Sequence, residues 1–214
     1  MASGSLGSLV PLNPGTNYSL YTSPSSTLVE GKVYITNRDS FPVKVRVAIS
    51  TDTIQYLNSS DYVVYDKKLN AGESYETESI YFSDGQTVIV KSDNTNVNFN
   101  LLGTEVGITT NCGVLTATSI TQTKLNESLY ISPSDIDLNI FACNKNPDPA
   151  TIRIGIGTEI SSKNYIEYNY TLHPGDVYSK TNLKVGTNDV IFIKSSNTNV
   201  NFVVCGKDSW HLLY

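Results

Sequence analysis

Histidine is the side chain most often used as a general base or metal ligand near neutral pH, and this chain has only two histidines. His173 lies in a Leu-His-Pro-Gly stretch, and a similar stretch earlier in the chain has Asn70 at this place. We therefore interpret His173 as a turn residue. His211 adjoins Trp210 near the last residue, and we interpret it as a contact of that end of the chain rather than as a catalytic base.

Carboxylates are the second group that could do chemistry, because two of them can act together in a glycosidase. Glu76 and Glu78 follow Glu73 by three and five positions, and an odd spacing on a strand places side chains on opposite faces. The corresponding positions later in the chain are Asp176, Ser179 and Thr181. We therefore predict no catalytic carboxylate pair and no enzymatic activity.

The stretch Ser-Asp-Asn-Thr-Asn at 92–96 offers oxygen atoms of the kind that Ca²⁺ prefers. Its later counterpart has Ser196 in place of Asp93, which is the only carboxylate of the stretch. Asn and Asp side chains also stabilise tight turns without an ion. We interpret this stretch as an Asx-rich hairpin turn, and we predict no metal and no cofactor.

The three cysteines, Cys112, Cys143 and Cys205, form neither a Cys-x-x-Cys pair nor an even disulfide framework. We interpret them as small buried residues or free thiols and predict no disulfide. A pairing of Cys143 with Cys205 stays open, because both fall in predicted strands of the same half of the chain.

The charge pattern disfavours two classes of partner. The formal net charge is −5, the pI is about 5.0 and the basic residues are scattered, so a phosphate backbone would be repelled. The longest apolar runs, such as Val-Ile-Phe-Ile at 190–193, are far shorter than the roughly 20 residues of a membrane helix. The first residues lack a basic segment followed by an apolar one, so we expect synthesis in the cytoplasm. We predict neither nucleic acid nor membrane as a partner.

An internal repeat is the strongest signal in the sequence. KSDNTNVNF at 91–99 recurs as KSSNTNVNF at 194–202, and LYTSP at 20–24 recurs as LYISP at 129–133. The offset changes from 109 residues at the earlier block to 103 at the later one, so short insertions and deletions separate the matching blocks. Such changes fall in loops. The chain therefore contains two copies of one module.

Within each copy the matching blocks alternate as strands do. Residues 43–49 alternate apolar and mostly basic or small side chains, and residues 97–101 alternate apolar side chains with asparagine. Each copy contains six or seven such short segments between Gly, Pro, Asn and Asp clusters, and none with helical periodicity. We predict an all-β protein of two tandem immunoglobulin-like antiparallel β-sandwich domains related by internal duplication.

The repeat also predicts the division of the chain into an extended N-terminal arm at 1–16, a first sandwich at 17–108, a linker at 109–125, a second sandwich at 126–208 and a C-terminal tail at 209–214. The arm is rich in Ser, Gly and Pro, so we expect a neighbouring molecule to order it. Its deletion should then leave both sandwiches folded. The partner-binding residues predicted in the arm and the tail are Leu6, Val10, Leu12, Trp210, Leu212 and Tyr214.

The assembled pattern has a familiar form. Its elements in the first copy are Leu20-Tyr21, Asn37-Arg38, Val45 to Ser50, Asp61-Tyr62 with Tyr65-Asp66, and Val97 to Glu105. It resembles small β modules of virion structural proteins from tailed bacteriophages, particularly those of marine and cyanobacterial hosts. The resemblance covers both copies, although the second departs from it at Asn164, Asn169 and Lys207-Asp208. It implies a component of a phage particle without enzymatic activity.

Two functions follow from this reading. The first is a non-enzymatic virion protein, a capsid decoration or a neck or tail accessory subunit, that binds other virion proteins as a homo-oligomer or in many copies. It would be made in the host cytoplasm and reside in the virion. The alternative is a receptor- or carbohydrate-binding adhesion module of the tail-fibre type that recognises a host surface glycan. The tyrosines that could form its stacking platform are Tyr18, Tyr21, Tyr165, Tyr168 and Tyr170.

Overall fold

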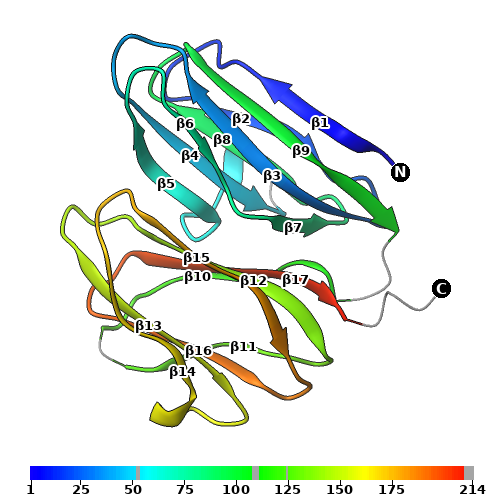
Figure 1. The fold of residues 1–214 in the computed structure, drawn as a ribbon, viewed down its shortest axis with the longest axis vertical. Helices are drawn as coiled ribbons and strands as arrows, with labels where there is room; N and C mark the ends of the chain where they lie inside the picture. The colour runs from blue at the N-terminus through cyan, green and yellow to red at the C-terminus, as the bar shows by residue number, and fades with distance from the viewer. Residues whose placement is uncertain (52–53, 108–110, 124, 210–214) are drawn as a thin grey trace.

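The computed structural model describes residues 1–51, 54–107, 111–123 and 125–209, and Figure 1 shows them as two all-β sandwiches, one above the other. The first sandwich contains β1 (Ser3–Leu9), β2 (Asn17–Thr22), β3 (Thr27–Asn37), β4 (Val43–Ser50), β5 (Tyr62–Leu69), β6 (Ser74–Glu76), β7 (Ile80–Ser83), β8 (Thr87–Ser92) and β9 (Val97–Gly107). The second contains β10 (Gly113–Ser119), β11 (Glu127–Ile131), β12 (Ile136–Asn144), β13 (Ala150–Gly157), β14 (Tyr165–Leu172), β15 (Val177–Val185), β16 (Val190–Ser195) and β17 (Val200–Asp208). One short 3₁₀ turn lies in each, η1 (Ile54–Tyr56) and η2 (Ser162–Asn164). Among the described residues no helix has the length and apolar character to cross a membrane.

Both sandwiches have the same strand order. The sheets of the first are β1-β9-β3-β6, with β7 also on β3, and β2-β8-β4-β5. The sheets of the second are β10-β17-β12-β15 and β11-β16-β13-β14, so β15 occupies the place of β6 and β7 together. All pairings are antiparallel, and two four-stranded sheets with this interleaved order form a jelly roll. The two tandem antiparallel sandwiches predicted from the repeat are therefore confirmed, but their strand order is that of a jelly roll with eight strand positions in each copy rather than the immunoglobulin-like order that was expected.

The first strand of each copy lies where the sequence analysis placed an arm and a linker. β1 falls within 1–16 and pairs with β9, from Ser3 opposite Thr104 to Leu9 opposite Phe99. β10 falls within 109–125 and pairs with β17 in the same way. The expectation of an arm ordered by a neighbouring molecule is thus corrected, because this chain itself orders the segment. An edge strand is fixed mainly by main-chain hydrogen bonds, so its Ser- and Gly-rich sequence gave little alternation to detect.

Each sandwich has its own core, and the predicted register holds. In the first, Val45, Val47 and Ile49 of β4 lie with Phe99 and Leu101 of β9 within one buried cluster. The corresponding cluster of the second sandwich draws on β12, β13, β16 and β17, and it includes Leu138, Ile152, Ile193 and Phe202. A shift of one residue in β4 or β9 would bury Lys44 and Arg46, or Asn98 and Asn100, in place of the apolar side chains, and this cost fixes the register.

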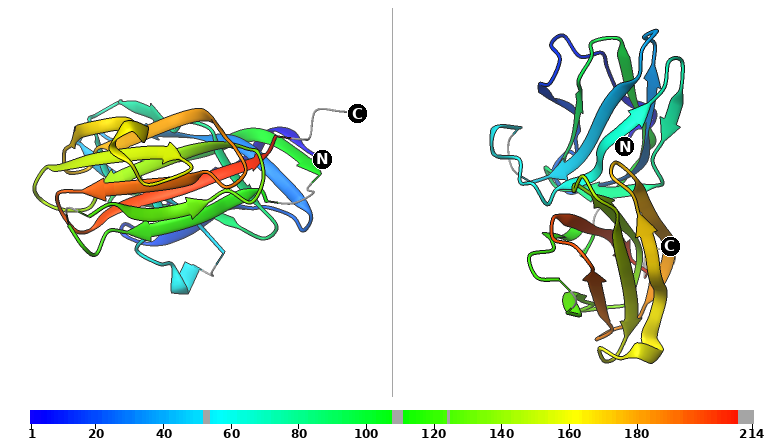
Figure 2. Two further views of the ribbon diagram at one scale, coloured as in Figure 1. Left: turned by 90° about the horizontal axis from the view of Figure 1, so that it is seen from below. Right: turned by 90° about the vertical axis from the view of Figure 1, so that its left-hand side faces the viewer.

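The two sandwiches also pack on each other. The edge formed by β5 and β7 lies against the outer face of the sheet β10-β17-β12-β15, as Figures 1 and 2 show. Three side chains of that sheet point away from the core of their own sandwich: Phe141, Val203 and Cys205. They are nevertheless buried, because they belong to the core cluster of the first sandwich. The sheet is therefore covered on both faces.

Polar contacts complete this interface. Asn139 Nδ2 donates to the Ser79 carbonyl oxygen at 2.7 Å, and Asn201 Nδ2 donates to that of Ser59 at 2.6 Å. Lys207 Nζ lies 2.8 Å from a carboxylate oxygen of Glu30. Buried amides that would otherwise lack partners are thus satisfied across the interface, which favours one fixed arrangement of the two sandwiches.

Candidate functional site

Two basic side chains stand opposite each other on the outer face of the second sandwich. β13 and β16 are the central strands of the sheet β11-β16-β13-β14, and Arg153 on β13 is the register partner of Lys194 on β16. Ile152 and Ile154 flank Arg153 in sequence and are fully buried in the core, so strand alternation turns Arg153 outward. The fold thereby places a guanidinium beside an ammonium group.

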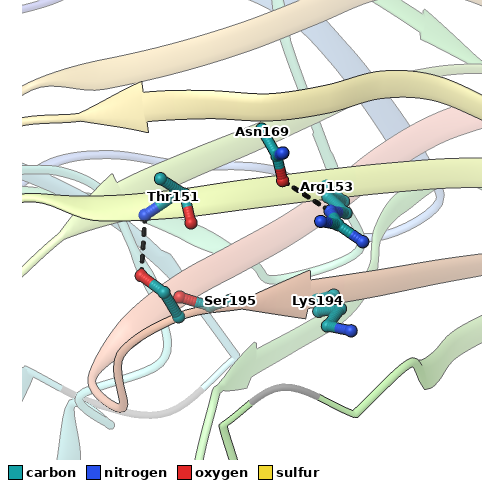
Figure 3. Close-up of a pocket in the computed structure, with 6 residues that line it drawn as sticks. Thr151, Arg153, Asn169, Lys194 and Ser195 are labelled. Carbon is teal, nitrogen blue, oxygen red and sulfur yellow. Dashed lines mark hydrogen bonds between the residues drawn. The ribbon is translucent and has the colours of Figure 1, made fainter.

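Neighbouring side chains from β14 hold the guanidinium of Arg153 in place. Its central carbon lies 4.0 Å from the ring centroid of Tyr168 and 5.8 Å from that of Tyr165. Its Nε donates to Asn169 Oδ1 at 2.6 Å, a bond drawn as a dashed line in Figure 3. Asn169 has a φ of 54°, in the left-handed region that Asn tolerates better than most residues, at an irregularity in the pairing of β13 with β14. This irregularity directs the amide toward Arg153.

These residues line a shallow pocket of about 260 Å³. The lining residues are Thr151, Arg153, Asn169, Lys194, Ser195 and Ser196 (Figure 3). The Ser196 hydroxyl accepts a hydrogen bond from the Thr151 amide at 2.8 Å. Two cations and several neutral donors therefore line the pocket, with no carboxylate among the lining residues. Charge-assisted hydrogen bonds to an oxyanion are the interaction that such a set of groups makes best.

The first sandwich has a matching pocket with different charges. Arg46 and Lys91 are register partners on β4 and β8, and the guanidinium carbon of Arg46 lies 4.0 Å from the Tyr65 ring centroid. Here Arg46 Nε lies 2.5 Å from Asp66 Oδ1, and Asp93 Oδ1 accepts from the Lys44 amide at 2.8 Å. The paired cations and the aromatic ring are arranged as in the second sandwich, but this pocket is also lined by two carboxylates and by Lys44.

This chain matches no protein-family model and no curated protein. Among solved structures, STIV MCP, a viral major capsid protein, aligns over 97% of this chain and 99% of its own at 9% identity and a TM-score of 0.36. The tandem CBM22-1-CBM22-2 domain of Paenibacillus barcinonensis Xyn10C aligns over 94% of this chain and 86% of its own at 9% identity and a TM-score of 0.29. Superpositions this loose assign no family, and the fold described above rests on the strand order.

Three of the six partner-binding residues predicted from the sequence belong to the described part of the chain. Leu6 is half-buried and packs on the core of its own sandwich, while Val10 and Leu12 follow β1 with 44% and 81% of their surfaces exposed. Trp210, Leu212 and Tyr214 lie outside the described residues.

The five tyrosines of the predicted stacking platform are also dispersed. Tyr18 and Tyr21 belong to β2 of the first sandwich and pack on its core, whereas Tyr170 contacts Tyr178 at 4.8 Å between ring centroids. Only Tyr165 and Tyr168 lie together, 5.3 Å apart beside Arg153.

The groups weighed for chemistry lie apart as well. His173 sits in the turn after β14, and its amide donates to Asp176 Oδ2. Glu73 accepts from the Asn70 amide at 2.7 Å, while Glu76 pairs with Lys32 at 3.5 Å. Within the described part of the chain, no three His, Cys, Asp or Glu side chains converge as metal ligands. His211 lies outside that part.

Sequence reasoning overlooked Arg153 and Lys194, although a signal was present. Aligning the two copies pairs Arg46 with Arg153 and Lys91 with Lys194, while the neighbouring Asp66 and Asp93 become Asn169 and Ser196. The second copy thus keeps both cations and has neither acidic neighbour, and this pattern is visible in the sequence alone.

Proposed function

We propose that this chain is a non-enzymatic structural protein of a tailed-phage virion, a capsid decoration or a neck or tail accessory subunit that binds other virion proteins in many copies. The sequence resemblance to phage virion modules suggests the setting. The proposal also draws on the architecture, because jelly rolls are common building blocks of viral capsids.

The observation that carries the proposal is the burial of the sheet β10-β17-β12-β15 on both faces. Phe141, Val203 and Cys205 belong to the core cluster of the first sandwich while their strands belong to the second. Two domains that share a buried cluster behave as one stiff body rather than as modules on a hinge. A stiff body with two similar halves suits a subunit that occupies a fixed place in a regular assembly.

The end of the first sandwich where β1 runs into β2 and β3 runs into β4 is the surface we propose for contact with other virion proteins. Leu12 and Phe41 lie in these two loops with 81% and 68% of their surfaces exposed. Val10, in the first loop, is also partly exposed. Exposed apolar side chains gathered at one end of a domain are a common feature of protein contacts.

The pocket around Arg153 supports a binding role rather than catalysis. Its lining residues include no carboxylate, imidazole or thiol, the groups that act most often as general acids and bases. An adhesion function is the second candidate, and the rings of Tyr165 and Tyr168 beside Arg153 are the observation that favours it.

The virion proposal is tested on purified particles. Mass spectrometry should detect this chain in gradient-purified particles at many copies each, and the double variant Leu12→Asp with Phe41→Asp should be incorporated at much lower occupancy while its melting temperature is unchanged. Ile160→Asp is the matched control, since Ile160 is 46% exposed but lies in the β13–β14 loop of the other sandwich. Particles that lack the chain would contradict the virion proposal. Full incorporation of the double variant would contradict the proposed contact surface.

A further inference from the structure

The pairing of Arg153 with Lys194 is unfavourable unless something offsets it. Side chains of register partners on antiparallel strands lie close together, and like charges there repel each other. In the first sandwich, the equivalent cations Arg46 and Lys91 share their pocket with a third cation, Lys44, and with two carboxylates, Asp66 and Asp93. In the second sandwich no salt bridge involves Arg153 or Lys194 among the described residues. Carboxylates therefore reduce the repulsion in the first copy, whereas no carboxylate lines the pocket of the second copy.

The replacements that remove the acids keep every hydrogen bond. Asn169 accepts from Arg153 Nε at 2.6 Å, as Asp66 accepts from Arg46 Nε at 2.5 Å. Ser196 accepts from the Thr151 amide at 2.8 Å, as Asp93 accepts from the Lys44 amide at 2.8 Å. The geometry of the pocket is thus maintained while both negative charges disappear. An oxyanion from outside the chain would restore the missing charge.

The donors of the second pocket are arranged to meet such a group. Nε of Arg153 is engaged by Asn169, and the guanidinium lies against the ring of Tyr168. Its two terminal nitrogens are the part that remains for a bidentate contact with an oxyanion, which is the contact that a planar guanidinium makes best. Lys194 adds a flexible ammonium group from the neighbouring strand.

The rings beside the pocket indicate what carries the anion. Tyr168 is 57% exposed, and Tyr165 meets it edge to face. An exposed aromatic ring with a polar edge suits a ligand that combines an apolar face with hydroxyl groups. A sugar ring has both. Arg153 and Lys194 are the two cations that line the pocket, which suits one acidic group on a sugar better than the closely spaced phosphates of a nucleic acid.

We propose that the pocket formed by Arg153, Lys194 and Asn169 binds the carboxylate or sulfate group of an acidic saccharide, with Tyr168 contacting the sugar ring. We expect the corresponding pocket of the first sandwich not to bind it, because Asp66 pairs with Arg46 there and both Asp66 and Asp93 repel an incoming anion. The site stands independently of the virion role proposed above.

The direct test is calorimetric titration of the purified chain with four probes: an oligogalacturonate, a heparin-derived sulfated oligosaccharide, a neutral cello-oligosaccharide of the same length, and inorganic sulfate. We expect saturable binding of at least one acidic oligosaccharide at one site per chain, weakening as salt is added. The two acidic probes distinguish a carboxylate from a sulfate ester. The neutral oligosaccharide should not bind, and inorganic sulfate should bind at least about tenfold more weakly because it lacks the sugar contact.

Paired variants locate the site. Arg153→Gln and Lys194→Gln should each weaken binding about tenfold or more, the effect of losing one charge-assisted hydrogen bond. The matched controls Arg46→Gln and Lys91→Gln, at the same positions of the first sandwich, should leave the affinity unchanged.

Exchanging the charges between the copies is the sharpest test, because each replacement is the residue that the other copy already carries there. Asn169→Asp with Ser196→Asp should abolish binding without unfolding the chain. Asp66→Asn with Asp93→Ser should create a second site and raise the stoichiometry to two per chain.

The proposal is overturned if neither acidic oligosaccharide binds, or if binding survives Arg153→Gln. Inorganic sulfate binding as tightly as the oligosaccharides would reduce the pocket to a site for a free ion and overturn the saccharide assignment. A single-stranded oligonucleotide that competes equally would overturn it in favour of nucleic acid. These measurements use no particles, so their failure leaves the virion proposal untouched, and a chain absent from particles leaves this site untouched.

Discussion

The thiol of Cys143 in the second sandwich donates a hydrogen bond to the main-chain oxygen of Tyr62 in the first, with 3.3 Å between the sulfur and the oxygen. Cys205 makes the converse contact, because its sulfur accepts from the Tyr81 amide at 3.3 Å. The third cysteine, Cys112, accepts at its carbonyl oxygen from the Ser83 hydroxyl. All three cysteines therefore lie where the two sandwiches meet, and all three are free thiols.

The reactivity of these thiols should report whether the interface is closed. Burial raises the pKa of both Cys143 and Cys205 to about 12, and both side chains are fully covered, so neither is a thiolate at pH 8. We expect an aromatic disulfide reagent at pH 8 to modify one thiol per native chain, that of the half-buried Cys112, and all three in denaturant. The variant Cys112→Ser should show no rapid reaction. Rapid modification of two or three thiols in the native chain would contradict the closed interface.

Gly175 should be more sensitive to substitution than its counterpart Gly72. Both have a positive φ, 74° and 72°, so alanine costs about 1–2 kcal/mol of backbone strain at either position. A Cβ at Gly175 would lie 2.7 Å from the main-chain oxygen of Asp66 in the other sandwich, whereas a Cβ at Gly72 meets nothing within 4 Å. Gly175→Ala should therefore lower the free energy of unfolding by about 1–3 kcal/mol more than Gly72→Ala, measured by urea denaturation. Equal losses would mean that the two sandwiches do not approach closely at this turn.

Phe141 and Tyr34 occupy equivalent positions on β12 and β3 but should differ in their contribution to stability. Phe141 is fully buried between the sandwiches, so Phe141→Ala should cost about 3–5 kcal/mol through lost burial and a new cavity. Tyr34 is half-buried on the open face of its sheet, so Tyr34→Ala should cost about 1 kcal/mol or less. The measurement is the unfolding free energy of each variant in denaturant. A small effect at Phe141 would show that the sandwiches are only loosely joined.

Removing β1 should destabilise the first sandwich. Deletion of residues 1–9 removes the pairing with β9 and the packing of Leu6 and Leu9 on the core, which together contribute about 2 kcal/mol or more. It also exposes the edge of β9, which favours aggregation. We expect a lower melting temperature by circular dichroism and increased light scattering. The control variant Val10→Ser with Leu12→Ser alters only exposed side chains beyond the strand, so it should change neither the melting temperature nor the light scattering. An unchanged melting temperature of the truncated chain would instead support a detachable arm.

Alternation and repetition in the sequence were sufficient to predict the core strands and their duplication. The pattern of Val45, Val47 and Ile49 identifies a strand with one buried face, and its recurrence at Ile152, Ile154 and Ile156 identifies the second copy. These features are local, because side chains on a strand point to alternating faces whatever packs against them. The first strand of each copy escaped detection because β1 and β10 are edge strands that are held largely by main-chain bonds to β9 and β17, and neither contains a regular alternation of apolar and polar residues.

The tertiary structure alone decided how the two copies meet and which side chains share a pocket. The first copy has Asn100 and Leu102 at the positions of Val203 and Cys205. The sequence does not show why Val203 and Cys205 are apolar, because they are buried by the first sandwich, which covers the outer face of their sheet. Likewise, Arg153 and Lys194 are 41 residues apart in sequence, and strand pairing makes them neighbours. Burial and electrostatic interaction depend on distances in space, and in an antiparallel sandwich these distances are set by pairings between strands that are remote along the chain.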